Sequence, residues 1–110
     1  MLLCITANYQ PHALEAMGEN PNTNRREAFE QLLTAAGAKL VGWYGTVAEG
    51  PGRMAIFEAE PAVAHAICSV VTSSGGVRNV KLQRLLSSEE IRAVRKKRVE
   101  LQKSYRPPGQ

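Results

Sequence analysis

The chain has 110 residues and a mass of 12.0 kDa, which is enough for one domain and too short for a second independent core. Hydrophobic residues make up 44% and charged residues 22% of the sequence, close to average globular usage, which excludes a disordered or fibrous chain. The net charge of +4 is carried by residues 87–110, because residues 1–86 are neutral.

The N-terminus has none of the features of a signal peptide, since Met1 to Ile5 contains no basic region and no long apolar stretch. No apolar stretch reaches the length of a membrane span, so we expect a cytoplasmic protein without membrane association. Cys4 and Cys68 lack the spacing of metal ligands, and every acidic residue is glutamate. We therefore expect buried thiols, no metal and no cofactor.

The first elements are a strand and a short helix. Residues 2–9 are rich in strand-forming side chains and end before Pro11, which a central strand would exclude. Pro11 suits the first turn of a helix, which Gly18 and Pro21 would cut short.

A second helix and a hairpin follow. Asn24 and Glu27 have the spacing of a helix N-cap and its reciprocal carboxylate, and Gly37 would end that helix. Residues 39–47 and 53–59 read as strands joined by a turn rich in glycine and proline, so we expect them to form a hairpin.

The last elements are a helix, a strand and a charged helix. Residues 61–74 begin with proline and carry one apolar face, and residues 77–85 alternate as a fourth strand. The alternation places Val77 with Asn79, Lys81 and Gln83, and Arg78 with Val80, Leu82 and Arg84. Ser87 and Glu90 form a predicted capping box, which begins a helix that runs to about residue 103.

The order strand-helix-strand-strand-helix-strand predicts an α+β, ferredoxin-like sandwich over residues 1–86, followed by a basic helix and frayed tail over residues 87–110. Right-handed crossovers put the helices on one face of the sheet and leave the other bare. The bare face would carry either Cys4, Thr6 and Asn8 or Leu3, Ile5 and Ala7. Both sets are apolar enough to predict a homodimer or higher oligomer that packs sheet against sheet.

Three segments carry a family resemblance, in the order LLCITANYQPHALEAM, RREAFEQLLTAAGAKLVGWYGTV and AIFEAEPAVAHAICSVVTSSGGVRNVKLQRLLSSEEI. Over residues 2–92 the chain resembles the GYD-domain family of small bacterial and archaeal proteins. The resemblance implies a ferredoxin-like fold and a dimeric α/β barrel, and it implies no agreed biochemical activity. The chain departs from the family where the Gly-acidic-Tyr-Asp signature is expected, because Glu49 to Met54 lacks both the aromatic residue and the aspartate.

A barrel of this type favours a cavity between the bare sheet faces or at the edge between sheet and helix, which would bind a small, partly apolar molecule. The candidate polar lining residues are Thr6, Asn8, Tyr44, Glu58 and Arg78. The alternative hypothesis is an enzyme similar to cofactor-independent monooxygenases or isomerases. No serine-hydrolase elbow, phosphate loop or dinucleotide fingerprint is present.

Glu58 admits two opposite interpretations. Paired with Arg53, Arg78 or Arg84, its carboxylate would be structural. Unpaired inside an apolar cavity, it would suit a general base.

The basic C-terminal helix leaves nucleic-acid or protein interaction open as a second alternative. We favour a solvated helix whose apolar residues dock on its own or a neighbouring subunit, because no nucleic-acid recognition motif accompanies the charge. These apolar residues are Ile91, Val94 and Leu101.

Overall fold

The computed structural model describes all 110 residues, with a four-stranded antiparallel sheet in the order β2-β3-β1-β4 at its centre. This order is that of a ferredoxin-like fold and confirms the predicted α+β class. The elements are β1 (Leu2–Tyr9), α1 (Pro11–Glu19), α2 (Arg25–Ala35), β2 (Lys39–Thr46), β3 (Gly52–Glu58), α3 (Pro61–Ser73), β4 (Val77–Arg84), α4 (Ser88–Leu101) and the short 3₁₀ helix η1 (Gln102–Ser104).

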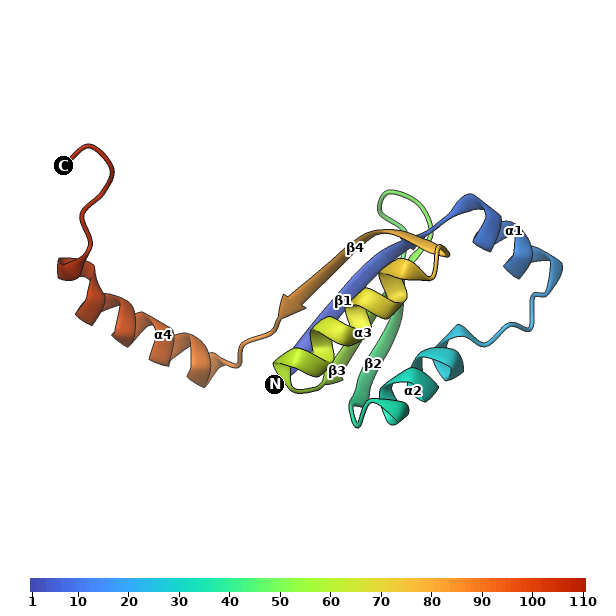
Figure 1. The fold of residues 1–110 in the computed structure, drawn as a ribbon, viewed down its shortest axis with the longest axis horizontal. Helices are drawn as coiled ribbons and strands as arrows, with labels where there is room; N and C mark the ends of the chain where they lie inside the picture. The colour runs from blue at the N-terminus through green and yellow to red at the C-terminus, as the bar shows by residue number, and fades with distance from the viewer.

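The hydrophobic core lies between one face of the sheet and the helices α2 and α3, and α3 lies across the sheet in Figure 1. Phe57 is fully buried, with a relative exposure of 0%, and it lies on the same face as Ala55 and Ile5. Since side chains alternate along a strand, the other face carries the residues between them. We call this other side the open face; it carries Cys4, Thr6, Asn8, Gly42, Tyr44, Met54, Ile56, Glu58, Arg78, Lys81 and Gln83.

The residues predicted to begin and end α2 do so in the structure. Asn24 accepts a hydrogen bond from the backbone N–H of Glu27, which begins α2. Gly37 ends α2 with a φ of +74°, and the N–H of Ala38 donates to the carbonyl oxygen of Leu33 over 2.8 Å, as in a Schellman motif. The short turn predicted after Pro11 is a helix of nine residues, α1, with no buried residue.

The predicted alternation along β4 is wrong at its start. Val77 pairs with Tyr9 and faces the helices, as do Val80 and Leu82, which pack against the core. The register with β1 shifts between Arg78 and Lys81, because Asn79 adopts a φ of +57° and forms a bulge. Arg78 therefore shares the open face with Lys81.

The helix α4 extends away from the sheet at the end of the molecule opposite α1 (Figure 1), and the molecule measures 59 × 33 × 22 Å. The predicted capping box is present: the N–H of Glu90 donates to Ser87 Oγ over 3.1 Å, and the N–H of Ser87 donates to Glu90 Oε1 over 3.2 Å. All of α4 is exposed, including the apolar side chains of Ile91, Val94 and Leu101. None of the helices combines the length and apolar character needed to cross a membrane.

Candidate functional site

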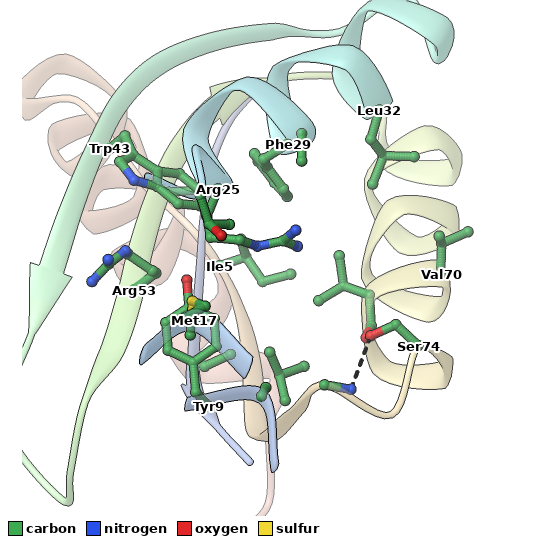
Figure 2. Close-up of a pocket in the computed structure, with 18 of the residues that line it drawn as sticks. Ile5, Tyr9, Met17, Arg25, Phe29, Leu32, Trp43, Arg53, Val70 and Ser74 are labelled. Carbon is green, nitrogen blue, oxygen red and sulfur yellow. Dashed lines mark hydrogen bonds between the residues drawn. The ribbon is translucent and has the colours of Figure 1, made fainter. Parts of the chain in front are cut away.

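A cavity of about 620 Å³ lies between the helix-covered face of the sheet and the helices α1, α2 and α3 (Figure 2). Strands β1, β2, β3 and the start of β4 supply its floor, and α1 supplies its outer wall through residues that include Met17. We call it the helix-side cavity; its lining residues are Ile5, Ala7, Tyr9, Ala13, Ala16, Met17, Asn20, Thr23, Arg25, Ala28, Phe29, Leu32, Trp43, Arg53, Ala55, Val70, Val71, Ser74, Gly76 and Val77.

Aromatic rings form one wall of the cavity. Phe29 on α2 lies over Trp43 on β2, with ring centroids 5.6 Å apart and planes tilted by 38°. The ring of Phe29 also meets the buried ring of Phe57 edge-on, with centroids 6.1 Å apart. Phe29 and Trp43 are only partly buried, so this wall is apolar and offers aromatic surface to a ring.

Arg53 is the charged group on the sheet side of the cavity. Its Nη1 donates a hydrogen bond to the carbonyl oxygen of Gly52 over 3.0 Å, and its Cζ lies 5.4 Å from the ring centroid of Tyr9. Its Nε is buried and has no hydrogen-bond partner. A buried N–H without an acceptor is uncommon, since it forgoes a hydrogen bond that water would supply.

Arg25 is the first residue of α2, and Figure 2 shows its guanidinium directed into the pocket. Its side chain forms no salt bridge and no hydrogen bond. Its neighbour Arg26 behaves differently, because Arg26 Nε lies 3.0 Å from Glu30 Oε1 on the outer side of the helix. The two arginines are adjacent in sequence, but Arg25 lines the helix-side cavity and Arg26 lies on the outer side of α2.

The residues that line the helix-side cavity include no glutamate, histidine or cysteine. Its ionisable groups are Tyr9, Arg25 and Arg53. The chemistry that these side chains supply is hydrogen-bond donation and positive charge against apolar walls.

The five polar candidates from the sequence lie on the open face and not in the helix-side cavity: Thr6, Asn8, Tyr44, Glu58 and Arg78. The structure brings two of them together, since Asn8 and Arg78 are cross-strand partners. They remain candidates for a site on the open face, where a second subunit would have to supply the other wall.

Asn8 is the buried polar residue of the open face, with a relative exposure of 6%. Its Nδ2 donates to the carbonyl oxygens of Ala48 and Gly50 over 3.3 and 3.2 Å. Arg78 reaches the same loop, because its Nη2 donates to the carbonyl oxygen of Glu49 over 3.1 Å. These two candidates therefore hold the β2–β3 loop.

Glu58 is exposed at the end of β3 and forms no salt bridge. The arginines considered as its partners are engaged elsewhere. Arg84 lies 2.7 Å from Glu90, and Arg53 faces the opposite side of the sheet. Neither the structural ion pair nor the buried base predicted as alternatives for Glu58 is present.

No group of three or more histidine, cysteine or acidic side chains is arranged to hold a metal ion. His65 is exposed on α3, as its position opposite the packed stripe predicted. Cys4 and Cys68 are free thiols, and burial raises the pKa of Cys4.

Comparison with protein families finds a match to the family described as GYD domain over residues 4–94, which confirms the resemblance seen in the sequence. No curated protein matches the chain. Among solved structures, a similar one is 5-chloro-2-hydroxyhydroquinone dehydrochlorinase (TftG) from Burkholderia phenoliruptrix AC1100, in a complex with 2,5-dihydroxybenzoquinone. The sequences are 19% identical, the TM-score is 0.56, and the match covers 81% of this chain and 97% of that chain. This likeness supports the fold.

Proposed function

The chain belongs to the GYD domain family, and from this premise we propose that the protein binds a small, partly apolar molecule in the helix-side cavity. The observation that carries the proposal is the cavity itself. Its volume of about 620 Å³ lies within the range of roughly 300–1,000 Å³ that is usual for small-molecule sites.

The distribution of polar groups supports binding. Most of the lining is apolar, and few polar side chains interrupt it, a pattern in which apolar walls supply affinity and polar groups supply orientation. A protein of the same fold forms a complex with 2,5-dihydroxybenzoquinone, a small ring compound.

Binding is favoured over catalysis by the same lining. A general base of the usual kind would be a histidine or a carboxylate, and the cavity has neither. The carboxylate considered in the sequence, Glu58, lies on the other face of the sheet. The lining does supply hydrogen-bond donors and aromatic rings, which are groups that bind and orient a ligand.

A pair of variants on α2 tests this proposal. Ala28 lines the helix-side cavity, and Ala35 lies on the outer side of the same helix. We expect Ala28→Phe to fill the cavity and abolish binding of 2-naphthamide, a neutral aromatic probe, in isothermal titration calorimetry. Ala35→Phe should bind the probe as the wild type does. Equal binding by the two variants would show that the cavity is not the site.

We infer second that a copy of the same chain covers the open face. Tyr44 has a relative exposure of 58%, and Met54 and Ile56 beside it are only half-buried, although they lie at the middle of the sheet. Such an apolar patch on a sheet without a covering layer is typical of an interface between subunits. The free state of both cysteines also agrees with a cytoplasmic location, which we propose together with the dimer.

Light scattering tests the assembly. The wild type should have a mass at least twice 12.0 kDa at micromolar concentration. Ile56→Lys on the open face should shift the mass toward the monomer, whereas Thr34→Lys on the exposed side of α2 should leave it unchanged. Truncation after Leu86 should weaken assembly if the apolar residues of α4 contact the partner subunit. A wild-type monomer would contradict the inference.

A further inference from the structure

The charge of the helix-side cavity is one-sided. Its lining contains two guanidinium groups, those of Arg25 and Arg53, and no carboxylate. Positive groups without a nearby carboxylate attract an anion, and apolar walls beside them favour an anion that also carries an apolar body. The lining therefore complements a negatively charged molecule.

The position of Arg25 adds to this argument. A cation in the first turn of a helix is disfavoured by the helix dipole, and the side chain of Arg25 gains no compensating ion pair. Glutamates stand nearby on the same helix, and Arg26 uses Glu30 in this way. Arg25 instead turns its guanidinium into the pocket (Figure 2).

Arg53 supplies a second positive charge on the sheet side of the cavity. The hydrogen bond from its Nη1 to the carbonyl oxygen of Gly52 and its contact with the Tyr9 ring hold the guanidinium in place. Figure 2 shows this guanidinium directed away from that of Arg25, so Arg25 is the cation that faces the pocket.

We propose that the molecule bound in the helix-side cavity is an aromatic carboxylate, with its ring against Phe29 and Trp43 and its carboxylate facing the guanidinium of Arg25. This step rests on the proposed binding function and names its ligand class. Arginine suits a carboxylate because its planar fork matches the two oxygens. The tilted aromatic wall suits a flat ring.

The test compares two probes that differ in charge and little in shape, 2-naphthoate and 2-naphthamide, by isothermal titration calorimetry at pH 7.5. The wild type should bind 2-naphthoate about ten-fold or more tightly than 2-naphthamide, since hydrogen bonds to charged groups are the stronger ones. Arg25→Gln should remove this preference, because it should weaken the binding of 2-naphthoate much more than the binding of 2-naphthamide.

Arg26→Gln is the matched control, because it removes the same charge one residue away on the outer side of the helix. It should retain the preference for 2-naphthoate. Arg25→Gln is expected to fold, since Arg25 is exposed and makes no contact that the substitution breaks.

The outcomes separate the ligand class from the site. Equal affinities of the wild type for both probes, or equal losses in Arg25→Gln and Arg26→Gln, would overturn the aromatic carboxylate and leave binding in the cavity standing. No binding of either probe would contradict the proposed function, and the ligand class with it.

Discussion

Asn79 Nδ2 donates a hydrogen bond to Asn8 Oδ1 over 3.2 Å, and this contact joins β4 to β1 at the point where the register shifts. Asn79 Nδ2 also lies 2.9 Å from Glu49 Oε2, in the β2–β3 loop. Because Asn8 donates to two carbonyl oxygens of the same loop, the two asparagines connect three parts of the chain. These contacts hold the β2–β3 loop against β1 and β4.

The first prediction concerns this network. Asn8→Ala should lower the free energy of unfolding by about 2 kcal/mol, because it removes the hydrogen bonds that this buried side chain makes to the β2–β3 loop. Urea denaturation followed by circular dichroism measures the change. As a control, Asn79→Gly should cost less than Asn79→Val, since glycine adopts the φ of +57° readily and a β-branched residue does not. A loss below about 0.5 kcal/mol for Asn8→Ala would show that the network contributes little.

The second prediction concerns Glu58. Glu58→Gln should change the free energy of unfolding by less than about 0.5 kcal/mol, because Glu58 is the last residue of β3, at the end of the open face, and its carboxylate forms no salt bridge. It should also leave the affinity for 2-naphthamide unchanged, because it lies on the open face. A loss of binding would return the site to the open face, where the sequence placed it.

The third prediction uses the two cysteines as reporters of burial. Cys4 has a relative exposure of 3%, and burial raises the pKa of its thiol, so little reactive thiolate forms at pH 8. Cys68 is only partly buried. Iodoacetamide should therefore modify Cys68 first, as read by mass spectrometry of peptides. In urea the difference should disappear, and faster modification of Cys4 in the folded protein would contradict the burial of β1.

The fourth prediction concerns the pH dependence of α4. The backbone N–H of Ser87, and to a lesser extent Arg84, lowers the pKa of Glu90 below its ordinary value. The cap therefore contributes fully above the unfolded-state pKa of about 4.3 and is lost as the pH falls through the lower folded-state pKa. The amide resonance of Ser87 should report this titration in NMR.

The matched variant for this titration is Glu90→Gln, in which the acid transition at Ser87 should be absent. A midpoint at or above the ordinary glutamate value in the wild type would show that the capping box does not form in solution.

Helix and strand positions were largely predictable, because proline, glycine and capping residues mark their ends. Pro61 begins α3, Gly37 ends α2 and Ser87 caps α4, each through a local interaction that needs no tertiary contact. The face of Val77 was not predictable from alternation, since the positive φ of Asn79 is a property of the folded chain.

The candidate site was harder to predict. Its outer wall depends on how α1 lies over the sheet, and α1 has no buried residue that would mark its packing. One signal was present in the sequence. Arg53 has the same strand parity as Ala55 and Phe57, which places a cation on the core side of β3. Polar residues on the open face were easier to recognise as site candidates, because they alternate with core residues along each strand. For this reason the site residues predicted from the sequence lie on the open face, and those of the helix-side cavity were missed.

Trp43 and Tyr44 are neighbours on β2 that face opposite sides of the sheet, so together they test the central claim that the ligand binds on the helix side. The most direct measurement is the set of intermolecular nuclear Overhauser effects between bound 2-naphthoate and the aromatic protons of the protein. The account predicts contacts from the probe to the rings of Trp43 and Phe29 and none to Tyr44. Contacts to Tyr44 without contacts to Trp43 would contradict it and place the site on the open face.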